Sequence, residues 1–142
     1  MDAYFVHMLS PGDLDAIATT SEAGTRIAYS EQQLSGWILA VQGVVAYLQG
    51  QPRSGGKIGI LGISLGAQIA SAASVGRSNI DALVLVDGAL PNGYSQPVRS
   101  FPPLLLIWGS LDRTFPVSIS IQNSLQEFVR TSQRSGRRSP RG

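Results

Sequence analysis

A serine between two glycines is the part of the chain whose residue types and spacing best fit chemistry. Residues 62–66 read Gly-Ile-Ser-Leu-Gly, directly after an aliphatic run at 57–61 and directly before a stretch of small residues with helical periodicity. A serine in a tight turn between strand and helix can present its hydroxyl as a nucleophile, if neighbouring glycines let the two backbones come close. We therefore take Ser64 as the candidate nucleophile and Gly62 and Gly66 as the glycines that the turn requires.

The same turn supplies a candidate donor for a developing negative charge. The backbone N–H of Leu65 stands at the expected start of the helix, where the positive end of the helix dipole would help to stabilise an oxyanion. The alternative interpretation is a strand-to-helix turn lined by glycines for packing, in which the serine is incidental. The five-residue motif alone is weakly specific, and its place between a strand and a helix favours the nucleophile.

Two aspartates follow later aliphatic runs and are candidates for the acid of the site. Asp112 lies shortly after the run at 104–108, and the carboxyl ends of parallel strands form the edge where open α/β sheets place their sites. We rank Asp112 first, with a loop aspartate making an Asx turn before Pro116 as the alternative. Asp87 follows the run at 81–86 and ranks second, since an Asp-Gly pair is also an ordinary turn sequence.

The N-terminal half predicts a short strand, a loop and a long helix. Residues 3–9 form an apolar, aromatic run suited to a buried strand, and Ser-Pro-Gly-Asp at 10–13 predicts a turn. Residues 10–30 show no clear pattern, which indicates a loop. A capping-box sequence at 30–33 precedes apolar residues at three- and four-residue steps over 34–48, which predicts a helix.

The C-terminal half alternates strands and helices. Strands are predicted at 57–61, 81–86 and 104–108, and the last two are nearly continuous apolar runs, typical of strands covered on both faces. A helix follows from residue 65, and Pro116 is suited to open a last helix with apolar positions at Val117, Ile121, Leu125 and Phe128. The fold class is therefore α/β, a mostly parallel sheet with flanking helices and right-handed crossovers.

These motifs together resemble a known family. GISLGA after an aliphatic strand, then ALVLVDGALP and PPLLLIWGSLDRTFP, is similar to the α/β-hydrolase fold and, within it, to the dienelactone hydrolase family, over about residues 33–129. The resemblance implies a partial α/β-hydrolase domain at 1–129, with Ser64 as nucleophile and Asp112 as the acid that orients a histidine. Dienelactone hydrolase proper uses a cysteine nucleophile, so the chain resembles the serine-bearing, esterase-like members. A small ester or lactone is the implied substrate.

The general base is the missing part of this pattern. The order of the family is Ser, Asp, His, whereas the one histidine of the chain, His7, precedes Ser64. His7 is a candidate base only if the fold brings it to the serine; a strand-end histidine with an ordinary hydrogen bond is the simpler interpretation. Two hypotheses follow: a serine hydrolase forming an acyl-enzyme at Ser64, or a catalytically incompetent hydrolase fragment, truncated at both ends, that at most binds ligands or a partner chain.

Composition and charge set further expectations. Residues 1–129 carry six basic and nine acidic residues, while 130–142 carry five arginines and no acid, so we expect a basic, disordered tail. The tail lacks aromatic residues, and nucleic acid is therefore not the expected partner. One histidine and no cysteine do not make a zinc site, and no metal or cofactor is expected. With no long apolar run and no basic signal sequence, we expect a cytoplasmic protein without a membrane segment.

Overall fold

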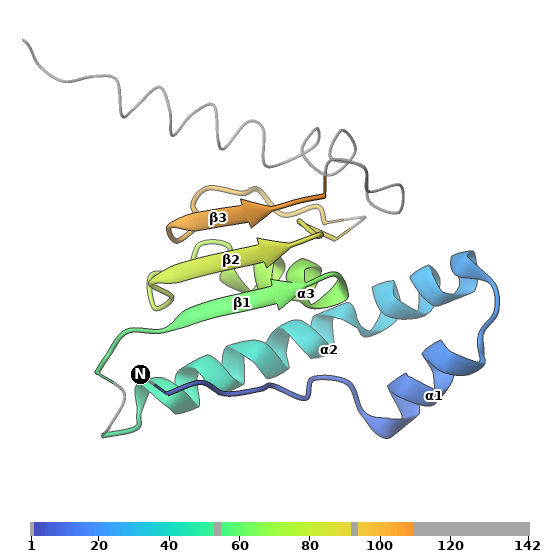
Figure 1. The fold of residues 1–142 in the computed structure, drawn as a ribbon, viewed down its shortest axis with the longest axis horizontal. Coiled ribbons are helices and arrows are strands. Elements are labelled where there is room, and N and C mark those ends of the chain that lie inside the picture. The colour runs from blue at the N-terminus through green and yellow to red at the C-terminus, as the bar shows by residue number, and fades with distance from the viewer. Residues whose placement is uncertain (1, 53–54, 92–93, 110–142) are drawn as a thin grey trace, which may run out of the picture.

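Three parallel strands form the centre of the structure. The computed structural model describes residues 2–52, 55–91 and 94–109. β1 (Gly59–Ile63), β2 (Ala82–Val86) and β3 (Leu104–Ile107) are hydrogen-bonded in the order β1-β2-β3, which is also their order along the chain (Figure 1). Aliphatic runs of this kind favour strands because β-branched and leucine side chains pack on a pleated surface. The three predicted strands and the α/β fold class are confirmed.

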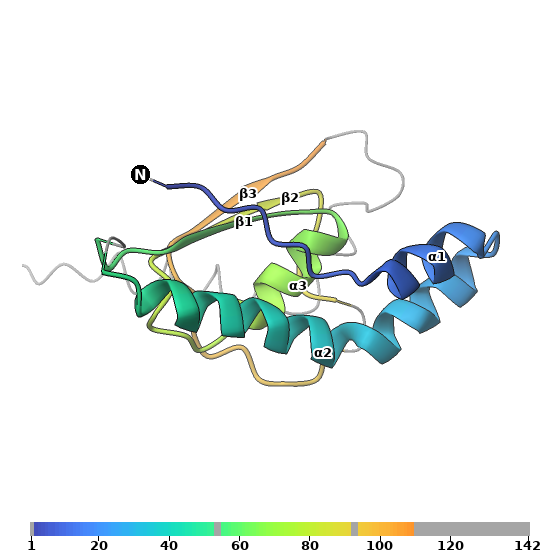
Figure 2. The same ribbon diagram turned by 90° about the horizontal axis from the view of Figure 1, so that it is seen from below.

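The helix after the first strand packs close to the sheet. α3 (Leu65–Ser74) connects β1 to β2 and is buried along most of its length, and α2 (Ala23–Gln49) packs beside it on the same side of the sheet (Figure 2). Four of its seven buried residues are alanines, and Ala67, Ala70 and Ala73 are almost inaccessible to solvent. Their small side chains let the helix axis approach the strands. This arrangement places the start of α3 at the carboxyl end of β1.

The long helix begins earlier than the sequence predicted. α2 spans Ala23–Gln49, and its buried residues Trp37, Val41 and Val45 follow the expected four-residue steps. The capping box predicted at 30–33 is wrong: Ser30 lies inside the helix, where its Oγ donates a hydrogen bond to the Arg26 carbonyl oxygen at 2.9 Å. A serine can satisfy its hydroxyl inside a helix in this way, so a capping sequence does not by itself mark a helix start.

A first helix occupies part of the predicted loop. α1 spans Pro11–Thr19, and Ser10 caps it: Ser10 Oγ accepts the Asp13 N–H at 3.1 Å, and the Asp13 carboxylate accepts the Ser10 N–H at 2.7 Å. The turn predicted at 10–13 and the loop predicted at 10–30 are therefore wrong. Proline at the first position of a helix and aspartate at the third both suit a helix start, which explains the difference.

The capping aspartate also fastens α1 to α2. The Tyr29 hydroxyl donates to Asp13 Oδ1 at 2.7 Å, and Trp37 Nε1 donates to Asp13 Oδ2 at 3.4 Å. The Tyr29 hydroxyl, followed by the bonds from Ser10, lowers the pKa of Asp13 to about 2 because donors stabilise the charged carboxylate. This buried polar cluster lies between the two helices and serves their packing.

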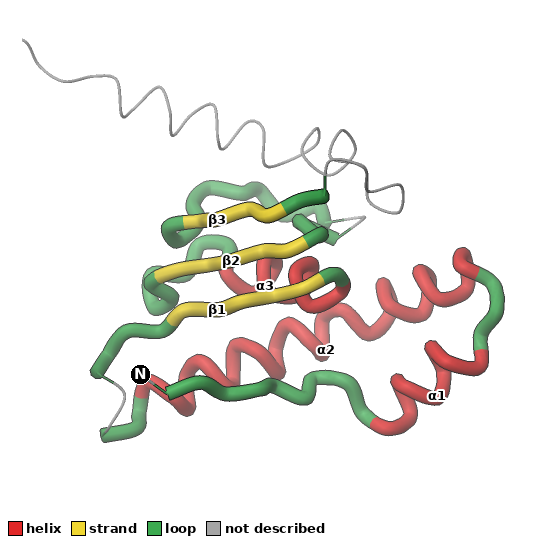
Figure 3. Tube along the Cα trace, in the orientation of Figure 1, coloured by secondary structure: helices red, strands yellow, loops and turns green. Residues whose placement is uncertain are grey.

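The N-terminal strand predicted at 3–9 is wrong. Residues 2–10 form no helix or strand (Figure 3), because their backbone is not paired with a neighbouring strand. Met8 and Leu9 pack against the core beside Trp37, whereas Phe5 is 86% exposed. The segment therefore keeps only part of its apolar surface from water.

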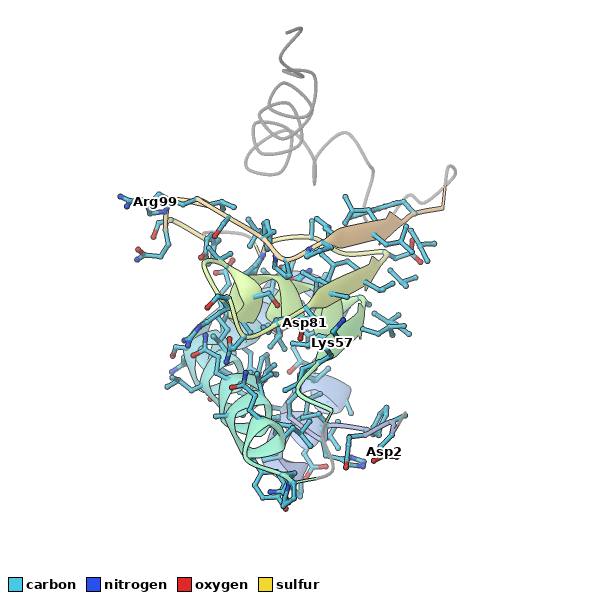
Figure 4. All side chains as sticks on the ribbon, turned by 90° about the vertical axis from the view of Figure 1, so that its left-hand side faces the viewer. Asp2, Lys57, Asp81 and Arg99 are labelled. Carbon is cyan, nitrogen blue, oxygen red and sulfur yellow. The ribbon has the colours of Figure 1, made fainter. Side chains whose placement is uncertain are left out.

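One face of the sheet is uncovered in the part of the chain that the structure describes. The pairing register aligns two rows of aliphatic side chains on this face, Leu61-Val84-Leu105 and Ile63-Val86-Ile107, which we call the outer face. Leu61 is 63% exposed and Leu105 55% exposed. Figure 4 shows side chains projecting from the sheet on the side away from the described helices. The expectation of strands covered on both faces is thus wrong for the described residues.

Candidate active site

Ser64 has the backbone geometry of a sharp strand-to-helix turn. It comes directly after β1 and directly before α3, with φ 53° and ψ −120°, a left-handed conformation that costs free energy in any residue with a Cβ. Its N–H donates to the Val86 carbonyl oxygen at 2.9 Å, and its own carbonyl oxygen accepts the Ala67 N–H at 2.9 Å. The sequence-based prediction of a strained serine at a strand end is confirmed.

The hydroxyl of Ser64 does not cap the helix that follows it, which is the usual role of a serine at this position. A serine before a helix commonly accepts a hydrogen bond from the first turn, but Ser64 makes no side-chain capping bond to α3, and the residue is exposed. The hydroxyl therefore does not stabilise the helix start. This observation counts against the interpretation of Ser64 as an incidental turn residue.

The two glycines of the motif have different roles. A Cβ on Gly62 would lie 2.5 Å from the Gly66 carbonyl oxygen and 2.7 Å from Ala67 Cα, so only glycine fits there. A Cβ on Gly66 would meet only Met8 Cε, at an ordinary 3.6 Å. The close approach of β1 and α3 thus depends on Gly62, and the expectation that both glycines must lack a Cβ is wrong for Gly66.

The residues after β2 complete the turn, and Gly88 was missed in the sequence analysis. A Cβ on Gly88 would lie 2.7 Å from the Ser64 carbonyl oxygen and 2.7 Å from Ala67 Cβ. The preceding residue, Asp87, has φ 47°, and its Oδ1 accepts the Gly109 N–H at 3.1 Å. The signal in the sequence is the Asp-Gly pair after an aliphatic strand, for which we weighed a second-ranked acid against an ordinary turn.

The other predicted site residues are only partly placed. Leu65 is the first residue of α3, so its N–H belongs to the first turn of the helix, whose amides have no partner within the helix. Asp112, the predicted acid, the helix predicted from Pro116 and the predicted tail at 130–142 lie outside the described residues. β3 runs parallel to β1, so the segment leading to Asp112 leaves the sheet at the same edge as Ser64.

His7 does not meet Ser64 in the structure. The histidine is exposed, and its ring packs edge-to-face on Phe5 with 4.9 Å between ring centroids. Within residues 2–52, 55–91 and 94–109, no hydrogen bond joins His7 to Ser64, and no group of three or more His, Cys, Asp or Glu residues could hold a metal ion. The described part of the site therefore contains the strained Ser64 turn and one helix N-terminus, without a histidine hydrogen-bonded to the serine.

The fold and this turn define an α/β-hydrolase-type domain. A family model described as BAAT / acyl-CoA thioester hydrolase C terminal matches residues 42–129, which is more than half of the chain. The chain belongs to this family of hydrolase domains. It matches no curated protein and no solved structure. Among the residues that the structure describes, no helix combines the length and apolar character needed to cross a membrane.

Proposed function

We propose that the chain is a serine-dependent acyl hydrolase domain whose substrates are acyl thioesters. The observation that carries the proposal is the exposed Ser64 at the junction of β1 and α3. Its backbone has a left-handed conformation, and its hydroxyl does not cap the helix. The thioester class comes from the name of the family, acyl-CoA thioester hydrolase. Small oxygen esters and lactones, the substrates implied by the resemblance to dienelactone hydrolases, are the alternative class.

The proposed reaction is a double displacement at the acyl carbon. Ser64 Oγ attacks the thioester carbonyl, the C–S bond breaks, and the thiolate leaves and is protonated while the acyl group stays on the serine. Water then hydrolyses the acyl-serine ester and restores the hydroxyl. The Leu65 N–H at the start of α3 is the proposed oxyanion donor, and Asp112 is the proposed acid of the triad.

The proposal includes slow turnover by the isolated chain. Attack requires a base that takes the proton of Ser64, and the one histidine of the chain is exposed and packed on Phe5. A serine hydrolase that lacks one triad member retains roughly 10³ to 10⁴ of rate over water when the rest of its site is intact. We therefore expect weak activity that an external base can raise.

The test is hydrolysis of acetyl-CoA, p-nitrophenyl acetate and a small lactone by the purified chain, with and without added imidazole. Imidazole should accelerate turnover by the wild type, and Ser64→Ala should abolish this acceleration, whereas His7→Ala should leave it unchanged. Preference for acetyl-CoA supports the thioester class, and preference for the ester or lactone supports the alternative. Turnover that survives Ser64→Ala would contradict the proposal. Loss of turnover in His7→Ala would identify His7 as the base.

A second candidate is a binding module without turnover. It is favoured by the same observation on His7, since a serine without a base keeps its proton near neutral pH. Ligand binding without imidazole-dependent hydrolysis, and no labelling of Ser64 by a fluorophosphonate, would favour this module over the hydrolase.

A further inference from the structure

The same type of backbone hydrogen bond connects the carboxyl end of β1 to β2 and that of β2 to β3. The Ser64 N–H donates to the Val86 carbonyl oxygen, and the Asp87 N–H donates to the Ile107 carbonyl oxygen at 3.0 Å. Each residue that follows a strand is thus held by the last residue of the next strand. Ser64 and Asp87 are also the two non-glycine residues with positive φ among those that the structure describes.

The side chain of Asp87 points along this edge toward β3. Its Oδ1 accepts the N–H of Gly109, two residues beyond the end of β3, at 3.1 Å. The strand order is β1-β2-β3 (Figure 1), so a carboxylate bonded to Gly109 beyond β3 is directed away from β1, the strand that Ser64 follows. An acid that oriented a base at Ser64 would have to turn the other way.

The residue after Asp87 contacts the nucleophile turn. Gly88 fits so closely against the Ser64 carbonyl oxygen and Ala67 that a Cβ would overlap both. Asp87 and Gly88 therefore connect two parts of the site: Gly88 packs on the turn that presents Ser64, and Asp87 holds the start of the segment that leads to Asp112.

We propose that Asp87 is a positioning residue that fixes Gly109, at the start of the loop after β3, relative to the Ser64 turn, and is not the acid of the triad. The proposal rests on the proposed function for the role of Asp112. The hydrogen bond holds Gly109, which stands three residues before Asp112 in the sequence. A small displacement of a catalytic group greatly reduces its effect, so a bond of this kind has a direct bearing on catalysis.

Three substitutions separate the hydrogen bond from other effects. Asp87→Asn keeps an Oδ1 acceptor and tolerates the left-handed backbone, while Asp87→Gly adopts φ 47° freely but has no acceptor. Asp81→Gly is the matched control, because Asp81 Oδ2 accepts the Ile58 N–H at 2.8 Å at the amino end of the sheet (Figure 4).

The first measurement is amide hydrogen exchange by NMR, which needs no activity. Asp87→Gly should raise the exchange rate of the Gly109 amide at least tenfold, and Asp87→Asn should leave it within about threefold of the wild type. Asp81→Gly should accelerate exchange at Ile58 and leave Gly109 unchanged. An unchanged Gly109 rate in Asp87→Gly, or equal acceleration in Asp87→Asn, would overturn the proposal.

The second measurement is the distance between the nucleophile helix and the acid. The chain has no cysteine, so spin labels attach only at introduced Gln68→Cys and Asp112→Cys. The distribution of distances between the labels should widen at least twofold with Asp87→Gly and keep its width with Asp87→Asn; no widening would contradict a positioning role. Fluorophosphonate labelling of Ser64 in the cysteine-free chain reports on the proposed function separately, since its failure would leave a positioned loop without an active serine.

Discussion

Ser64 combines an exposed hydroxyl with a backbone conformation that its own Cβ disfavours. The residue keeps φ 53° because Val86, Ala67 and Gly88 hold its backbone from three sides. Residues held in such conformations occur often at functional sites, where the surrounding structure compensates for the strain. The strain at Ser64 is therefore a measurable property of the turn, independent of any reaction.

Ser64→Gly should be more stable than Ser64→Ala by about 1 kcal/mol, because glycine adopts the left-handed conformation without a Cβ clash. Both variants lose the hydroxyl, so the comparison isolates the backbone. Urea denaturation of the two variants measures the difference in the free energy of unfolding. Equal midpoints would mean that the turn stores no strain.

The elements of the fold were more predictable than their ends. Strands β1, β2 and β3 and helix α3 followed from aliphatic runs and from the change in periodicity at Ser64, because local pattern and burial agree there. The starts of α1 and α2 were missed since Ser10 and Ser30 are both capping-type residues, and only the folded structure decides which of them caps a helix. The strand predicted at 3–9 is absent for the same reason, because pairing depends on a neighbour that a local pattern does not specify.

The candidate site likewise combines features that a local motif predicts with features that it does not predict. The turn at Ser64 was predictable because a local motif specifies it, whereas Gly88 and the Asp87 to Gly109 bond depend on contacts between segments more than 20 residues apart in sequence. The different roles of Gly62 and Gly66 also depend on contacts in the folded structure. In the motif they are equivalent, but only Gly62 faces the backbone of α3.

Gly62→Ala should destabilise the domain by about 3 kcal/mol, because the new methyl group would overlap the Gly66 carbonyl oxygen and separate β1 from α3. Gly66→Ala is the matched control and should be neutral or stabilising by up to about 1 kcal/mol, since alanine favours a helix. Thermal unfolding followed by circular dichroism checks both variants. Similar losses of stability would show that the contact of β1 with α3 does not distinguish the two glycines.

In the part of the molecule that the structure describes, the sheet has one face against helices and one face in water. The outer face presents two aligned rows of three aliphatic side chains, in which Leu61 and Leu105 are more than half exposed. Contiguous apolar surface of this kind promotes association or binds apolar dyes. We therefore expect the outer face to control association and dye binding by the isolated chain in solution.

Leu105→Lys should lower the fluorescence of bound anilinonaphthalene sulfonate and raise solubility, while it changes the free energy of unfolding by about 0.5 kcal/mol or less. The control is Leu85→Lys, since Leu85 is fully buried on the opposite face and a lysine there would bury an unpaired charge. That variant should fail to fold. Equal destabilisation by the two substitutions would show that the outer face is covered in solution.

The bond from Ser64 to Val86 and the contact with Gly88 also order events during synthesis of the chain. Ser64 leaves the ribosome 24 residues before Gly88, so the turn cannot take its final form until the residues of β2 have followed. At about 5 to 20 residues per second, that interval lasts roughly 1 to 5 s. During this time α3 can form as a helix, but Ser64 at its start still lacks two of the residues that hold its backbone, Val86 and Gly88. Ser64, the proposed nucleophile, thus reaches its final backbone conformation only after β1, α3 and β2 have been synthesised.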